Sequence, residues 1–212
     1  AYKPLRGAPR INVLITAIGV SFILQNTAKS LPIIGPNPYQ YPTFPVRNIE
    51  LAPGVTVNLT QVAVFVVAVI LMVLLNVIIN RTRIGKAMRA VSQDADTARL
   101  MGIPVNNVIS FTFALGASLA AAAGILFASS FPQINPYMGM MPGLKAFVAA
   151  VFGGIGSIPG AMLGGFIIAL AETFTKGFIS SKLADAVAFG ILILILLVRP
   201  SGIMGRDLRD KV

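Results

Sequence analysis

Two long apolar runs, residues 59–79 and 108–130, constrain the fold of this 212-residue chain more than any other feature. A helix that crosses the hydrocarbon core of a bilayer needs about 20 mostly apolar residues, and both runs reach that length. Charged residues make up only 11% of the chain, against roughly 25% in a typical soluble domain. We therefore predict an all-α fold, a polytopic bundle of transmembrane helices.

Four further segments complete the predicted bundle. Residues 11–26, 159–175 and 184–198 are shorter or less uniformly apolar, and residues 143–158 are interrupted by glycines. The interrupted segment either crosses as a short helix or enters and turns back, which lipid tolerates only where protein or water covers the backbone. We expect about six membrane segments and interpret residues 1–212 as one transmembrane domain. The Pro- and Gly-rich residues 27–58 cannot form a continuous helix and are expected to be an extracytoplasmic loop.

Basic residues set the expected orientation, because Lys and Arg gather in cytoplasmic loops. They occur near the start, in residues 80–107 and after residue 198 (Lys3, Arg6, Arg10; Arg81, Arg83, Lys86, Arg89, Arg99; Arg199, Arg206, Arg209, Lys211). Residues 80–107 and both chain ends are therefore expected in the cytoplasm, and the connections 27–58, 131–142 and 176–183 outside. The same rule accounts for the net charge of +10, so no nucleic-acid partner is expected.

Several kinds of chemistry are excluded by composition. The chain has no Cys and no His, which removes thiolate chemistry, imidazole metal sites and the Ser-His and Cys-His catalytic pairs. The phosphate-binding pattern G-x-x-x-x-G-K-[ST] is also missing. We expect no catalytic residue, no metal and no cofactor. A channel or gradient-driven transporter would carry charges along several spans, and a membrane enzyme would carry paired carboxylates or a Ser-Lys pair; the transporter alternative stays open.

The polar stretch "AVSQDADTARLMGIP", residues 90–104, interrupts the apolar sequence. Ser92 is a candidate N-cap, and Asp94 and Asp96 then fall in the first turn, where the helix dipole favours carboxylates. Gly102 and Pro104 form a stop signal. The stretch predicts a short helix over residues 93–101.

One side of this predicted helix is apolar and shallow, since Ala95, Ala98 and Met101 recur at helical spacing. A helix this short is marginal by itself in water. Its apolar side must therefore pack against the membrane domain of this chain or against a partner; a self-contained cytoplasmic loop is the other interpretation.

Asp96-Thr97-Ala98, followed after three residues by Gly102, resembles the Glu-Ala-Ala, three residues, Gly pattern in permeases of ATP-binding cassette importers. Those permeases insert this loop into a groove of their ATPase subunit. Asp replaces Glu here and Thr replaces the first Ala. The resemblance implies that residues 80–107 are the ATPase-coupling loop, with Ser92, Asp94, Asp96, Thr97, Ala98, Gly102 and Pro104 as its functional residues.

Longer stretches are similar to the Liv-type branched-chain amino acid permease family: "AYKPLR", "ITAIGVSFILQN", "INPYMGMMPGLKAFVAAVFGGIGSIPGAMLGG" and "LLVRPSGIMG". Members carry further membrane segments before the position of Ala1, so the chain looks like the carboxy-terminal two-thirds of such a permease. The resemblance implies a bacterial inner-membrane importer of leucine, isoleucine and valine. It also implies two ATPase subunits, a second permease subunit and a soluble substrate-binding protein. A permease for urea, short amides or another small solute is the alternative.

The candidate translocation path is less readable from sequence. Glu172 is a carboxylate inside a predicted span, a functional candidate by default, although it lies near the outer end, where it could reach water. Asn135 could hydrogen-bond a zwitterion or line a loop. The preferred path element is the glycine-rich stretch containing Gly153, Gly154, Gly156 and Gly160, because glycines expose backbone groups to a cavity. A structural hairpin is the alternative for that stretch.

Two remaining patterns have a structural and a functional interpretation. Gly116, Ala120 and Gly124, and likewise Gly160 and Gly164, recur every four residues, which allows close helix packing in lipid or a seam beside the path. The outward loops are the expected dock for the binding protein. Their aromatic residues are either its anchors or an interfacial belt (Tyr39, Tyr41, Phe44).

Overall fold

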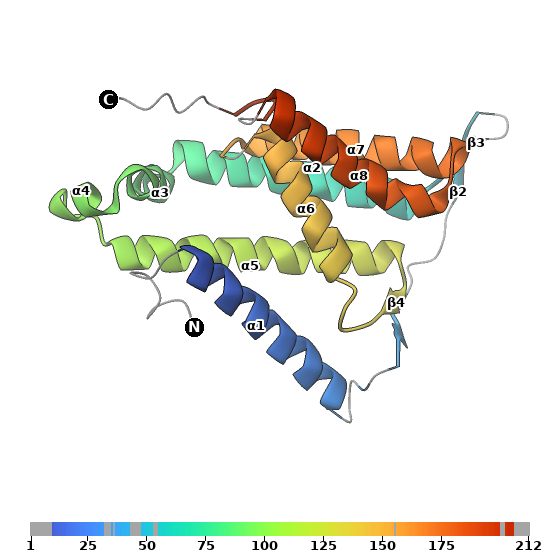
Figure 1. The fold of residues 1–212 in the computed structure, drawn as a ribbon, viewed down its shortest axis with the longest axis horizontal. Helices are drawn as coiled ribbons and strands as arrows, with labels where there is room; N and C mark the ends of the chain where they lie inside the picture. The colour runs from blue at the N-terminus through green and yellow to red at the C-terminus, as the bar shows by residue number, and fades with distance from the viewer. Residues whose placement is uncertain are drawn as a thin grey trace.

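The computed structural model describes residues 10–31, 35, 37–42, 48–52, 55–154, 156–199 and 202–205. Its helices are α1 (Arg10–Ser30), α2 (Leu59–Arg81), α3 (Arg83–Gln93), α4 (Ala95–Leu100), α5 (Val105–Ser130), α6 (Met140–Gly153), α7 (Ile158–Phe178) and α8 (Ala184–Val198), with a 3-10 helix η2 (Ser181–Leu183) before α8. The strands are β1 (Tyr39–Gln40), β2 (Asn48–Ala52), β3 (Val55–Asn58) and β4 (Gln133–Ile134). The predicted all-α polytopic bundle is confirmed, with short strands added (Figure 1).

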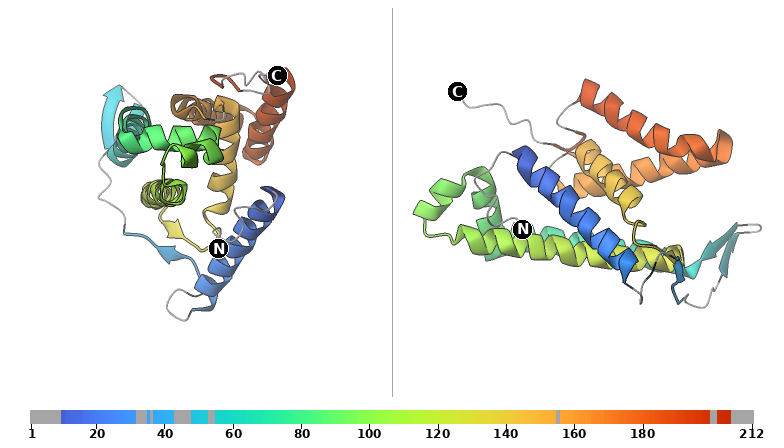
Figure 2. Two further views of the ribbon diagram at one scale, coloured as in Figure 1. Left: turned by 90° about the vertical axis from the view of Figure 1, so that its left-hand side faces the viewer. Right: turned by 60° about the horizontal axis from the view of Figure 1, so that its bottom comes forward.

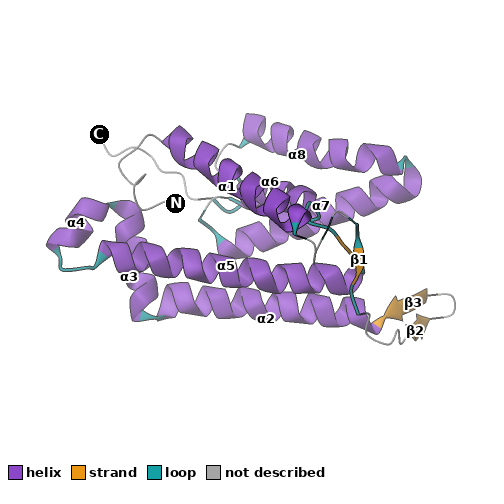
Figure 3. Cartoon of the chain, turned by 90° about the horizontal axis from the view of Figure 1, so that it is seen from below, coloured by secondary structure: helices purple, strands orange, loops and turns teal. Residues whose placement is uncertain are grey.

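The strands gather at one end of the bundle. β1 pairs antiparallel with β4, and β2 with β3, and all four lie opposite α3 and α4 (Figures 1 and 3). We call these two ends the strand end and the α3–α4 end. Helices α1, α5 and α7 finish at the strand end, whereas α2, α6 and α8 finish toward the α3–α4 end. The described parts of the connections expected outside therefore share one end, and residues 80–107 occupy the other.

Within the described residues, four helical segments are long and apolar enough to cross a membrane: α2, α5, α7 and Ser181–Val198. α2, which the structure describes throughout, buries none of its residues. Large apolar side chains on α2 and α5 are exposed, among them Phe65, Ile70 and Phe113. Such surfaces are unusual on a soluble protein and suit contact with lipid or with another membrane subunit.

α6 is a short helix that does not turn back. It has 14 residues, about 21 Å at 1.5 Å per residue, and packs antiparallel to α7 and parallel to α8. The chain after α8 contacts the C-terminal end of α6, because the backbone N–H groups of Ile203 and Met204 donate to the carbonyls of Phe152 and Gly153, each at 3.0 Å. The glycine-interrupted segment is thus a short helix followed by a tight turn.

The packed core lies among α6, α7 and α8. Val148, Phe152, Ile168 and Ala188 are buried there. α6 and α7 approach so closely that a Cβ on Gly160 would collide with the backbone carbonyl of Gly153. Burial of these side chains supplies the main apolar contact that this chain makes with itself.

The two small-residue repeats differ in what they meet. Gly160 and Gly164 face α6, where added Cβ atoms would meet the carbonyls of Gly153 and Ala149, so the predicted close packing is confirmed for them. At Gly116 and Gly124 of α5, an added Cβ would have no described atom of another element within 4 Å. The α5 repeat therefore does not pack against the described part of this chain.

α1 lies along an edge of the bundle (Figure 2). Near the strand end the Tyr137 hydroxyl donates to Asn26 Oδ1 at 3.3 Å, and Lys29 Nζ lies 5.9 Å from the centre of the Tyr137 ring. Ile18 and Ile23 are more than half exposed. The main packed unit thus consists of α2 to α8.

Candidate functional site

The α3–α4 end is built as a rigid corner. The Thr82 hydroxyl joins α2 to α3, because its oxygen accepts from the Gly85 N–H at 3.1 Å while it donates to the Ile78 carbonyl of α2. Arg89 Nη1 donates to the Ile79 carbonyl at 2.7 Å and to Asn80 Oδ1 at 3.0 Å. A Cβ on Gly85 would collide with α2 carbonyls, so glycine permits the close approach.

Sequence reasoning missed α3, because the basic residues of this segment were interpreted only as a topology signal. Ile84, Ala87, Met88 and Val91 are all partly buried and follow the i, i+3, i+4, i+7 spacing of an amphipathic helix. That spacing could have revealed the helix.

α4 starts two residues later than predicted. Ser92 is not its N-cap, because it lies inside α3 and its hydroxyl donates to the Arg89 carbonyl. Asp94 takes the capping position: its Oδ1 accepts from the N–H groups of Asp96 and Thr97 at 2.9 and 3.2 Å, and the Thr97 hydroxyl donates to Oδ2. A carboxylate can accept from several helix donors at once, and Asp94 rather than Ser92 takes the cap because α3 continues through Gln93.

The C-terminal end of α4 follows the predicted stop signal. Gly102 has a φ of +79°, and the N–H groups of Gly102 and Ile103 donate to the carbonyls of Arg99 and Ala98, each at 3.0 Å. This is a Schellman turn. Pro104 then precedes α5, so both ends of α4 are fixed by local hydrogen bonds.

The apolar side of α4 differs from the predicted stripe. Ala98 is buried and Ala95 partly buried, but Met101 is 78% exposed, which corrects its expected place on the packed side. Leu100 is 88% exposed beside it. The Schellman turn sends Met101 away from Ala98. Leu100 and Met101 together form an exposed apolar tip where α4 ends, and α4 itself lies at the extremity of the bundle (Figure 1).

Replacing Asp94 with alanine is expected to speed hydrogen exchange of the α4 amides by roughly fivefold, because three hydrogen bonds to the carboxylate are lost. Asp94→Asn keeps an acceptor oxygen and should lose less. Hydrogen exchange measured by mass spectrometry and corrected for intrinsic rates checks this. Equal exchange in the alanine variant and the unmodified protein would show that Asp94 does not hold α4.

Acid is also expected to speed hydrogen exchange of the α4 amides, because it protonates Asp94. The Thr97 hydroxyl, and then the backbone N–H groups of Thr97 and Asp96, hold the pKa of Asp94 below its usual value. A carboxyl whose pKa is lowered by folding contributes its stabilisation fully above its unfolded pKa of about 3.9 and loses it as the pH falls through the lower folded value. The cap is therefore complete at neutral pH and is lost only in strong acid.

A cavity of about 950 Å³ lies near the strand end, between the end of α5, the following loop, α6 and α7. Much of its wall is apolar, with contributions from Phe127, Met138, Met141 and Ile168. Its polar groups are few and come from different elements: Gln133, Asn135, Lys145, Glu172 and Lys176. Small-molecule sites commonly have this size and this mixture of apolar wall and a few placed polar groups.

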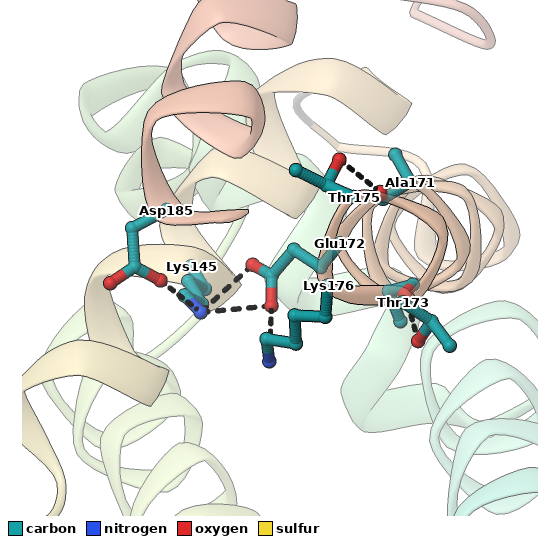
Figure 4. Close-up of polar contacts among 8 residues, drawn as sticks. Lys145, Ala171, Glu172, Thr173, Thr175, Lys176 and Asp185 are labelled. Atoms are coloured by element: carbon teal, nitrogen blue, oxygen red, sulfur yellow. Dashed lines mark hydrogen bonds and ion pairs between the residues drawn. The ribbon is translucent and has the colours of Figure 1, made fainter. Parts of the chain in front are cut away.

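Charged side chains of alternating sign meet at this cavity (Figure 4). Lys145 Nζ of α6 lies 2.8 Å from Oε1 and 2.9 Å from Oε2 of Glu172 on α7. On its other side Lys145 Nζ lies 2.7 Å from Asp185 Oδ1 of α8. Lys176 Nζ lies 3.7 Å from Glu172 Oε2. We call Asp185, Lys145, Glu172 and Lys176 the charge cluster.

The structure corrects the sequence interpretation of Glu172. Its position near the end of its segment suggested access to water, but the residue is only 8% exposed and its carboxylate is paired with Lys145. Sequence reasoning missed Lys145 and Asp185. A lone lysine in the apolar residues 143–158 was the available signal, since a charge in a membrane segment requires a partner.

The structure separates the other candidate path residues into two groups. Asn135 lines the cavity together with Glu172. Gly153 and Gly160 are instead at the α6–α7 contact, where added Cβ atoms would meet backbone. Gly154 and Gly156 have φ values of +107° and +93° in the turn between these helices. These four glycines therefore do not line the cavity.

The aromatic residues of the outward loops are only partly described. Tyr39 belongs to β1 and is half exposed, and the Tyr41 N–H donates to the Pro132 carbonyl at 2.7 Å. Both lie at the strand end. Phe44 lies outside the described residues.

Membrane-capable helices with exposed apolar flanks, and a cavity with paired charges between α5, α6 and α7, are the features expected of an integral membrane transport protein. The chain belongs to the family described as the permease component of the branched-chain amino acid transport system, whose sequence model matches residues 5–196.

Two curated relatives from bacteria match this chain along its whole length. It is 43% identical to the high-affinity branched-chain amino acid transport system permease protein BraD of Pseudomonas aeruginosa and 41% identical to LivH of Escherichia coli K12. Each match covers 100% of this chain and 70% of the relative. The probable permease LivH of Methanocaldococcus jannaschii is 31% identical over 69% of this chain and 48% of the relative. No solved structure matches the chain at a significant level.

Proposed function

We propose that this chain is a membrane-spanning subunit of an ATP-driven importer for branched-chain amino acids, namely leucine, isoleucine and valine. The observation that carries the proposal is the match of the entire chain, at 41–43% identity, to permeases named for high-affinity branched-chain amino acid transport. The chain is not itself an enzyme. ATP is hydrolysed by partner ATPase subunits, because the sequence has no phosphate-binding loop.

The assembled importer contains two ATPase subunits, a second permease subunit and a soluble substrate-binding protein in the inner membrane of a bacterium. Residues 80–107 and both chain ends face the cytoplasm. The supporting observation is that α3 and α4, with their excess of basic residues, lie at one end of the bundle and the strands at the other. The binding protein docks at the strand end.

α4 is the segment that the ATPase subunit binds. Its apolar tip, Leu100 and Met101, is exposed and suits a shallow groove on a partner. Ser92, Asp94, Asp96, Thr97, Ala98, Gly102 and Pro104 form the coupling loop, and the two hydrogen-bonded ends of α4 make it stiff. Closure of the ATPase pair moves this corner, and α2 and α5 follow because both are joined to it. The importer thereby shifts between inward-open and outward-open states.

Replacing Gly102 with valine tests the coupling. The φ of +79° is strongly unfavourable for a β-branched residue, whereas an added Cβ meets no described atom within 4 Å, so the expected effect is backbone strain and not a clash of the Cβ. We expect leucine uptake to fall by roughly 5- to 150-fold, the range of a typical coupling free energy, while the amount of protein in the membrane stays normal.

Asparagine is the matched control, because it tolerates the left-handed conformation. Gly102→Asn should retain most uptake. Normal uptake and normal stimulation of the ATPase in the valine variant would overturn the coupling role. Labelled-leucine uptake in cells with and without this subunit tests the transport function itself.

A permease for another small solute is the second candidate. More distant relatives are named for import of autoinducer 2, at 32% identity over 55% of this chain, and of fructose, at 22% identity over 92%. Relatives of this chain are thus named for other solutes, and urea and short amides are further candidates. Competition of unlabelled sugars, amides and amino acids against labelled leucine separates the two candidates.

A further inference from the structure

We propose that the cavity at the strand end is a binding site for a free amino acid in its zwitterionic form. Lys145 receives the α-carboxylate, Glu172 receives the α-ammonium group, and the apolar wall receives the side chain. This inference rests on the proposed function and extends it by placing a substrate site within the permease itself.

The lining of the cavity includes, side by side, both charges that a zwitterion needs. Lys145 Nζ and the Glu172 carboxylate lie 2.8–2.9 Å apart, and both residues line the cavity with Lys176. The ammonium and carboxylate groups of an amino acid are attached to one carbon atom, so they reach two neighbouring opposite charges together. A solute with only one charge reaches only one of them.

When the amino acid binds, the contact between Lys145 and Glu172 is replaced by their contacts with its two charged groups. The charge cluster makes this replacement tolerable. Glu172 is buried, and a buried charge deprived of its partner is strongly unfavourable. Asp185 lies 2.7 Å from Lys145 and is not part of the cavity lining, so Lys145 keeps a counterion when its contact with Glu172 is replaced. The cluster has two positive and two negative members, and a zwitterion adds no net charge. Binding therefore leaves every charge paired.

The remaining wall suits an aliphatic side chain. Phe127, Met138, Met141 and Ile168 face the cavity, and methionine adapts its shape to ligands of different branching. The cavity is several times larger than one such side chain, which fits a weak site that releases its ligand readily. Its position at the strand end is where the docked binding protein would deliver substrate.

Thiol protection tests the site directly, because the chain contains no Cys and one introduced cysteine is its only thiol. Ala169→Cys places the thiol at an exposed position in the cavity lining, and Ala146→Cys does so from α6. Ser181→Cys is the matched control, exposed near the strand end but outside the lining. The full chain in lipid nanodiscs is treated with a membrane-impermeant maleimide, with and without L-leucine.

Leucine is expected to slow labelling of both cavity thiols and not of Ser181→Cys. Leucinamide, which lacks the carboxylate, and 4-methylpentanoate, which lacks the ammonium group, should each need at least about tenfold higher concentration for the same protection. In Lys145→Gln the advantage of leucine over leucinamide should disappear, and in Glu172→Gln its advantage over 4-methylpentanoate. The double variant Lys145→Gln/Glu172→Gln, which leaves no unpaired charge in this pair, should lose both advantages and serves if a single variant does not fold.

No protection of either cavity thiol by millimolar leucine would overturn the site, as would equal protection by all three compounds, which would indicate apolar binding alone. Unchanged discrimination in the double variant would remove Lys145 and Glu172 from it. Leucine uptake measured on the assembled transporter distinguishes the two proposals. Uptake without protection contradicts the site only, whereas protection without uptake contradicts the transport function and leaves the site standing.

Discussion

Gly160→Ala is expected to destabilise the protein by about 1–3 kcal/mol or more, although alanine is normally the better helix residue by about 1 kcal/mol. The added methyl group would collide with the Gly153 carbonyl and lie 2.9 Å from Ser157 Oγ. Because the carbonyl is backbone, α6 and α7 must separate to make room. That separation disrupts the core around Val148 and Ile168.

Gly116→Ala is the matched control, since no described atom outside its own helix lies within 4 Å of the added group. It should leave stability unchanged or raise it slightly. Thermal unfolding in detergent, followed by the loss of monodisperse protein on size exclusion, measures both variants. Equal unfolding temperatures for Gly160→Ala and Gly116→Ala would show that α6 and α7 do not pack as described.

Lys145→Met is expected to cost about 3–5 kcal/mol, because it leaves the buried Glu172 carboxylate without its close partner. Lys176 Nζ, at 3.7 Å and half exposed, compensates only partly. Asp185 also loses a partner, but its side chain is 49% exposed and water can solvate it. The cost therefore comes mainly from Glu172.

Lys145→Met/Glu172→Met should recover most of that loss, since replacing a whole buried ion pair by apolar side chains is often close to neutral. The two single variants and the double variant form a thermodynamic cycle, measured by the same thermal unfolding. Equal melting of Lys145→Met and the double variant would mean that Glu172 is not stabilised by Lys145.

The apolar runs predict the bundle because lipid permits few alternatives to a helix, and α2, α5, α7 and α8 follow from length and composition. The repeat of Gly160 and Gly164 also predicts that their helix packs closely against another one, which the structure shows to be α6. What sequence could not supply is the pairing of distant residues. Lys145 and Glu172 are 27 positions apart, and only the antiparallel packing of α6 on α7 brings them together.

Local hydrogen bonding decides the smaller differences. Ser92 and Asp94 both suit an N-cap by residue type, and the choice depends on where α3 ends, which in turn depends on its packing against α2. Likewise the spacing of Ala95, Ala98 and Met101 assumes a helix that continues through Met101. The Schellman turn ends it at Leu100 and places Met101 outside.

The helices form two packed groups that share a boundary. α3 and α4 pack with α2 and α5, α6 packs with α7 and α8, and α2 contacts α7 between the groups. The cavity is lined by Phe127 of α5, by Phe131 directly after it, and by residues of α6 and α7. A movement of one group relative to the other would therefore alter the distance across the cavity between Phe127 and the residues of α6 and α7. Under the coupling role proposed for α4, a displacement applied there would reshape this cavity at the opposite end of the bundle.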